Sequence, residues 1–156
     1  MRDVVVAFQA ALLGTALEAL GRFVWNGPYL PELMAEKFFA LIPVWAFTPL
    51  FRVFGYNSKY YAFGGMIAAE IAGLTLLGAV SRKWIRRRQR VGWRIPWLAA
   101  AIAGPLAVAI LVGLLPLLDA GVAGQTLIGG VWITVPSVFV VAGCYATALA
   151  RGVSRQ

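Results

Sequence analysis

The stretch Ile95–Leu117, with the sequence IPWLAAAIAGPLAVAILVGLLPL, contains no charged and no amide side chain. About 20 apolar residues in a helix are enough to cross the hydrocarbon core of a bilayer. The stretch includes Pro105, which membrane helices tolerate where neighbouring groups satisfy the freed backbone carbonyl. It therefore predicts a transmembrane helix over residues 95–117.

The composition of the whole chain agrees with a membrane environment. Of 156 residues, 61% are hydrophobic and 13% are charged, which is about half the charged fraction of an ordinary soluble domain. A soluble domain of this size would bury only about two-thirds of its surface, so much of this apolar surface would face water. We therefore expect a single transmembrane domain over residues 1–156.

Three further apolar segments extend this pattern on both sides, over about residues 4–25, 60–80 and 127–149. Each is long enough to span a bilayer. The sequence thus predicts an all-α integral membrane protein with four transmembrane helices.

Small residues recur at four-residue spacing in two of these segments, which lets helix backbones approach closely. The two sets are Gly65, Ala69 and Gly73, and Ala142, Ala146 and Ala150.

A strongly basic loop is expected over residues 81–94, between the second and third spans. Short loops with such an excess of positive charge stay in the cytoplasm, so four spans place both termini in the cytoplasm of a bacterium, with the chain in its inner membrane. The loop is predicted to contact anionic lipid headgroups, or else a soluble partner, and no nucleic-acid partner is expected. The predicted contact residues are Arg82, Lys83, Trp84, Arg86, Arg87, Arg88, Arg90 and Arg94.

The connection over residues 29–59 is unusual because it is rich in both proline and aromatic residues. Pro31 favours a helix start, whereas Pro43 and Pro49 interrupt the chain after that short helix. Aromatic side chains concentrate at the membrane–water interface, which predicts an interfacial or re-entrant helical connection on the outer side. A fifth span is the alternative, and it would place the N-terminus outside. The predicted outer contacts are Tyr29, Trp45, Phe47, Phe51 and Tyr56.

Three ionisable residues are candidates for a functional role within the membrane: Glu18, Arg22 and Glu70. Charges at this depth are costly and often mark function. Glu18 and Arg22 are four residues apart, so they share a helix face and are expected to form an ion pair. Glu70 has no basic residue at helical spacing, and it is expected to be protonated or to pair with Arg22 or Arg52 from another segment.

The sequence contains no histidine, which argues against histidine-ligated haem, chlorophyll and the usual zinc sites. Cys144 is expected to be a small core residue. No catalytic set is recognisable, so an enzyme is not expected, and no metal or histidine-bound cofactor is predicted; contacts with lipid or pigment stay open. An interfacial lipid-modifying site would have to use charged residues of the outer connection, namely Glu32, Glu36, Lys37 and Arg52, which are better explained as solvated charges.

Several motifs resemble a known group of proteins. The segment 30–51, LPELMAEKFFALIPVWAFTPLF, is followed by Phe54-Gly55 and Lys59; the turn 114–121 reads LLPLLDAG, and Tyr145 lies near the end of the last apolar segment. This pattern resembles the N-terminal membrane region of bacterial membrane-anchored sulfite-oxidase-type molybdopterin oxidoreductases. The sequence ends at Gln156 without their cofactor domain, so no molybdenum ligand carries over. The resemblance implies a membrane anchor beside redox or photosynthetic partners.

These features support two hypotheses for the function. The first is a non-catalytic membrane subunit that serves as scaffold or anchor in a larger complex, with other membrane subunits as partners. The alternative is a small proton-coupled transporter or proton-conducting protein that uses Glu70, with Glu18 as helper. A single buried acid makes a poor pathway, which favours the first hypothesis at this point.

Overall fold

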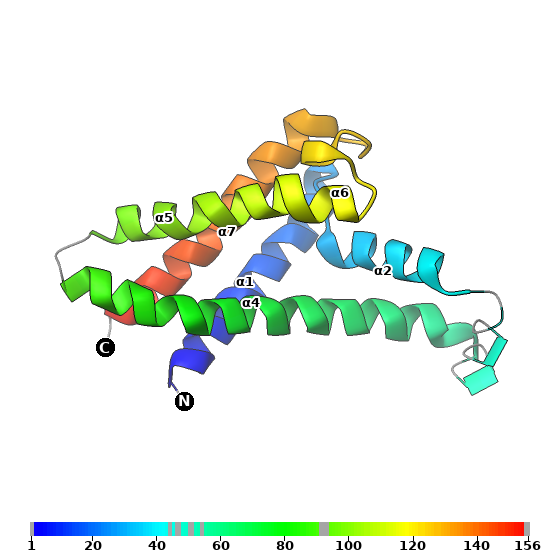
Figure 1. Ribbon diagram of the computed structural model, residues 1–156, viewed down its shortest axis with the longest axis horizontal. Coiled ribbons are helices and arrows are strands. Elements are labelled where there is room, and N and C mark those ends of the chain that lie inside the picture. The colour runs from blue at the N-terminus through cyan, green and yellow to red at the C-terminus, as the bar shows by residue number, and fades with distance from the viewer. Residues whose placement is uncertain are drawn as a thin grey trace.

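The computed structural model describes residues 2–43, 45, 48–49, 52–53, 55–90 and 94–154. Its regular structure there is helical (Figure 1). The longer helices are α1 (Arg2–Trp25), α2 (Leu30–Leu41), α4 (Ser58–Arg90), α5 (Ile95–Val108) and α7 (Gly130–Ser154), and the shorter turns are η1 (Gly55–Asn57), the π-helical η2 (Ala109–Leu114), α6 (Leu115–Leu117) and η3 (Val122–Gly124).

Four helices in the described ranges are long and apolar enough to cross a membrane. They cover Asp3–Trp25, Ser58–Gln89, Ile95–Leu117 and Gly130–Gly152. The predicted all-helical architecture with four candidate spans is therefore confirmed. The third span keeps its helical course past Pro105 and changes to π-helical hydrogen bonding from Ala109 to Leu114.

Helix α4 is much longer than predicted, because it runs without interruption from Ser58 to Arg90. At about 1.5 Å per residue, its 33 residues extend for roughly 50 Å, beyond the roughly 30 Å of a hydrocarbon core. The prediction of a loop over residues 81–94 was therefore wrong for residues 81–90. Arginine, lysine and glutamine are good helix formers, and the segment contains no proline or glycine before Gly92.

The connection between α1 and α4 contains α2, which has 12 residues and is too short to cross a bilayer. Helix α2 packs along the N-terminal part of α4 (Figure 1). In the described part of this connection, Trp45 is 79% exposed. The predicted contacts Phe47 and Phe51 lie outside the described residues, and so does the side chain of Tyr56.

Two apolar clusters hold the bundle together, and both are rich in alanine. One joins α5 to α7 and includes Leu30 of α2, and the other joins α1, α4, α5 and α7. The small residues Ala142, Ala146 and Ala150 are buried in these contacts, as expected for close helix packing. The other predicted set, on α4, behaves differently, because a Cβ added at Gly65 or Gly73 would meet open space.

Both termini lie at the end of the bundle where α4 connects to α5 (Figure 1). Polar contacts with α4 hold both terminal segments at this end. Asp3 pairs with Arg82 and Arg86, and the Gly152 carbonyl accepts a hydrogen bond from Arg82. We call this the basic end. The turns at Asn26–Tyr29 and Asp119–Gly130 lie at the opposite end.

Candidate functional site

Two carboxyl groups are buried together in the middle of the bundle. Glu18 comes from α1 and Glu70 from α4, and each residue is 8% exposed. Their side chains are close enough to interact electrostatically. The structure thus places beside Glu70 a second acid, whereas helical spacing alone assigned Glu18 to a separate ion pair.

Thr15 fixes the position of Glu70. Its hydroxyl donates a hydrogen bond of 3.1 Å to Oε1 of Glu70, and Thr15 is itself buried. Thr15 and Glu18 are three residues apart, so they lie on the same face of α1. That face therefore supplies both a hydrogen-bond donor and a second carboxyl group to Glu70. Thr15 was not predicted as a site residue. Its position three residues before Glu18 in an apolar helix is the signal in the sequence that could have indicated it.

The N-terminus of α2 reaches the other carboxyl group. Asn26 adopts a left-handed conformation with φ of 54°, and the Gly27 N–H donates to the Gly21 carbonyl at 3.2 Å, which ends α1 and reverses the chain. Helix α2 then begins at Leu30, whose N–H donates to Oε2 of Glu18 at 3.4 Å. A helix N-terminus carries partial positive charge and favours a nearby anion.

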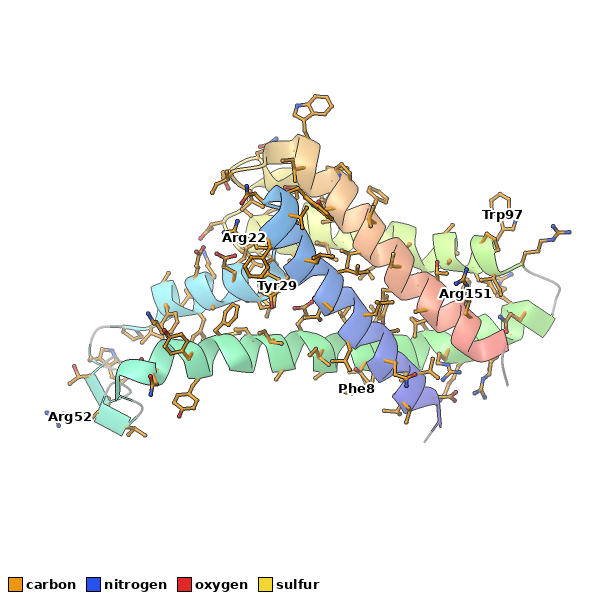
Figure 2. All side chains as sticks on the ribbon, turned by 180° about the vertical axis from the view of Figure 1, so that it is seen from behind. Phe8, Arg22, Tyr29, Arg52, Trp97 and Arg151 are labelled. Carbon is orange, nitrogen blue, oxygen red and sulfur yellow. The ribbon has the colours of Figure 1, made fainter. Side chains whose placement is uncertain are left out.

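Arg22 pairs with Glu32 and not with Glu18, so the predicted Glu18–Arg22 ion pair was wrong. Arg22 Nε and Nη2 lie 2.7 and 3.0 Å from the two carboxylate oxygens of Glu32. The chain reversal brings Glu32 beside Arg22, and a two-pronged contact with a guanidinium is stronger than a single one. Figure 2 shows Arg22 and Tyr29 together where α1 ends and α2 begins.

Neither predicted cationic partner reaches Glu70. Arg22 is engaged by Glu32, and Arg52 lies at the far end of the connection, away from α1 (Figure 2). In the described ranges the ion pairs use Asp3, Glu32 and Asp119, and none includes Glu18 or Glu70. Among the described groups, Oε2 of Glu70 is buried with no hydrogen-bond partner.

Tyr29 lies beside the pair and is not a fully exposed interfacial aromatic. Its ring packs edge-to-face on Phe63 of α4 with centroids 5.9 Å apart. Burial raises the pKa of the Tyr29 phenol, and the charges of Glu70, Glu18 and Glu32 add to this effect. The phenol is therefore neutral at physiological pH.

The basic residues at the end of α4 fall into two groups. Arg82 is buried, with its Nη1 2.9 Å from an Asp3 carboxylate oxygen, and Arg86 shares that carboxylate. The prediction that Arg82 faces lipid headgroups was therefore wrong, because its charge serves helix packing. Lys83, Trp84, Arg87, Arg88 and Arg94 are exposed, and the Arg88 guanidinium lies 5.6 Å from the Trp84 ring centroid. The Arg90 side chain lies outside the described residues.

The described residues contain no cluster of three or more acidic, cysteine or histidine side chains that could hold a metal ion. Cys144, expected in the core, is partly exposed.

Comparison of this chain with protein-family models, curated proteins and solved structures finds no match. The resemblance to sulfite-oxidase-type membrane regions therefore stays a prediction, as do the redox and photosynthetic partners that it implies.

Proposed function

We propose that this chain is a small multi-pass membrane protein that takes up and releases protons at the Glu18–Glu70 pair, as part of proton-coupled transport or proton conduction. The observation that carries the proposal is the placement of two buried carboxyl groups close enough to interact electrostatically, with no ion-pair partner among the described residues. This arrangement answers the objection that one acid makes a poor pathway.

The physical argument concerns charge in an apolar interior. Two neighbouring carboxylates that are both ionised repel each other, and each loses its hydration, so the pair retains at least one proton. Thr15 and the Leu30 N–H each stabilise one carboxyl group. Protonation of one carboxyl group therefore affects the other, which is a property that a proton-exchanging site requires.

Replacing Glu70 with glutamine is expected to abolish this proton exchange, because the amide keeps the shape of the side chain but cannot titrate. In proteoliposomes, a potassium diffusion potential should drive proton uptake by the parent chain, and the Glu70→Gln variant should match protein-free vesicles. Infrared spectra of the purified protein should also lose the pH-dependent carbonyl band of a buried carboxylic acid.

The matched control is Asp119→Asn, a carboxyl-to-amide change at a side chain that is 74% exposed. It should leave both the flux and the infrared band unchanged. Equal proton flux in the parent and in Glu70→Gln, with both proteins folded, would contradict the proposal.

A second candidate function is the scaffold or anchor subunit, and the exposed face of α4 favours it. In the most apolar 18-residue stretch of α4 only 11% of residues are buried, whereas 33% to 44% are buried in the corresponding stretches of the other three candidate spans. A Cβ added at Gly65 or Gly73 of α4 would meet nothing within 4 Å. An apolar groove of about 520 Å³ also lies along α4, and Phe8 and Ala72 are among the residues that line it. Small residues at four-residue spacing suit the close approach of another transmembrane helix.

The scaffold function predicts that bulky side chains on this face prevent assembly. Copurification from native membranes in mild detergent, read by mass spectrometry, should show partners with the parent chain but not with the double variant Gly65→Leu, Gly73→Leu. Gly104→Leu is the control, because position 104 on α5 also meets open space. A parent chain that purifies as a stable monomer with no partner would rule out this function.

A further inference from the structure

Trp25 lies at the end of α1 opposite the basic end, where the residue is 41% exposed and its indole contacts α7. Its indole N–H donates to Ser137 Oγ on α7 at 2.7 Å, and Ser137 Oγ donates to the Ile133 carbonyl at 2.6 Å. Two glycines make room for the indole. A Cβ at Gly21 would lie 3.1 Å from a ring carbon of Trp25, and a Cβ at Gly27 would lie 3.1 Å from its Nε1 and 3.2 Å from Ser137 Oγ.

A small cavity of about 20 Å³ lies beneath this ring, and Glu18, Trp25 and Ser137 are among the residues that line it. A cavity needs about 10–15 Å³ of this kind of volume to hold one water molecule, together with two or more polar partners. The Glu18 carboxyl group and the Ser137 hydroxyl group provide two such partners. The cavity therefore has room for one water molecule next to Glu18.

A larger polar pocket of about 170 Å³ lies next to this cavity at the same end of the bundle. Its polar lining includes Arg22, Asn26, Glu32, Glu36 and Thr126. Gly27 and Pro28 line both spaces, so this short segment is the wall between them. The Trp25–Ser137 hydrogen bond lies next to the same wall, because a Cβ added at Gly27 would meet both of its polar atoms.

The opposite direction offers no comparable route among the described residues. From Thr15 toward the basic end, the α1 core positions are Ala11, Ala10 and Ala7, each no more than 1% exposed. They pack with apolar side chains and Tyr145 in one continuous cluster. Tyr145 donates its hydroxyl to the Leu74 carbonyl, so its proton is already engaged.

The ionisable groups around Glu18 come from few elements. Glu70 faces it from α4, Tyr29 and Glu32 lie at the start of α2, and Arg22 follows one turn along α1. Helix α5 and the π-helical η2 have no ionisable side chain in their sequences, and those of α7 are Cys144, Tyr145 and Arg151, none of which interacts with Glu18.

We propose that Trp25 closes a water route from the polar pocket at Arg22 and Glu32 to Glu18, so that the carboxyl pair exchanges protons with the end of the bundle opposite the basic end. This inference rests on the proposed function, because it specifies how protons reach the same pair. Trp25 acts as a positioning residue: its indole holds Gly27 and Ser137 together and separates the two spaces. Breaking its hydrogen bond joins the cavity to the pocket.

Carbodiimide labelling of Glu18 and Glu70 in proteoliposomes tests this route. A membrane-impermeant, water-soluble carbodiimide is added outside, and orientation is scored by whether external trypsin cleaves at the basic end. Labelled peptides are expected in the trypsin-protected molecules, whose opposite end faces the reagent. Trp25→Phe and Ser137→Ala each remove the closing hydrogen bond, and each should raise the labelling rate by about tenfold, the factor expected for one lost hydrogen bond.

Trp132→Phe is the matched control, because Trp132 is 91% exposed and its replacement should leave the rate unchanged. Labelling confined to molecules whose basic end faces the reagent, or rates in Trp25→Phe and Ser137→Ala equal to the parent, would overturn the route while leaving proton exchange intact. A lipid-soluble carbodiimide separates the two proposals. If it also fails to label either acid at low pH, the pair holds no accessible proton, and both the proposed function and the route fall.

Discussion

Replacing Gly78 with leucine is expected to lower the free energy of unfolding by about 3 kcal/mol or more, because the new side chain has no space. Gly78 lies where α4 crosses α1 and α7. A Cβ at this position would already lie 2.9 Å from the Tyr145 hydroxyl, 3.0 Å from Ala7 Cβ and 3.1 Å from a Leu149 methyl carbon. Its neighbours come from two other helices, so relief requires the helices to move apart. Denaturant titration in mixed micelles measures the change.

The same change at Gly73, on the same helix, is the control. A Cβ there meets nothing within 4 Å, so Gly73→Leu should change the stability of the isolated chain by less than about 1 kcal/mol. Equal destabilisation by the two variants would show that Gly78 is not a crossing point, and the arrangement of α4 against α1 and α7 would then need revision.

Replacing Asp3 with asparagine is expected to lower the stability by about 3 kcal/mol, the lower part of the range for breaking a buried ion pair. The Arg82 side chain is 1% exposed, and the Asp3 carboxylate at 2.9 Å offsets its charge. Asparagine keeps the size of the side chain and removes the negative charge. The expected loss is at the lower part of the range because Asp3 is 37% exposed and solvent screens part of the interaction.

Asp119→Asn makes the matched comparison. Asp119 pairs with Lys37 at the opposite end, but its side chain is 74% exposed. Exposed ion pairs contribute about 0–1 kcal/mol, so this variant should unfold at nearly the same denaturant concentration as the parent. If Asp3→Asn were as mild as Asp119→Asn, the Asp3–Arg82 contact would not hold α1 against α4.

The candidate spans were predictable because each depends on local properties of the chain. Runs of about 20 apolar residues and the turn residues that separate them can be recognised directly in the sequence. The limits of α4 were less predictable. The basic residues at 81–90 indicated a loop by their charge, yet nothing in them stops a helix, and α4 continues to Arg90.

The partners of the buried charges could not be predicted from spacing along one helix. Glu18 and Arg22 share a face of α1, which suggested an ion pair. The reversal at Asn26–Pro28 instead brings Glu32 to Arg22 and the Leu30 N–H to Glu18. Glu18 is then left to face Glu70, a residue 52 positions away in the sequence.

The sequence by itself determined that the chain forms long apolar helices that suit a membrane, since the hydrophobic pattern that sets them is local and repeats along each segment. Only the tertiary structure decided which charges meet. The energy of a buried charge depends on all groups around it in three dimensions, including those that a chain reversal brings from elsewhere. For that reason Arg82, predicted at the lipid surface, is the buried partner of Asp3, and Glu18 and Glu70 form one site.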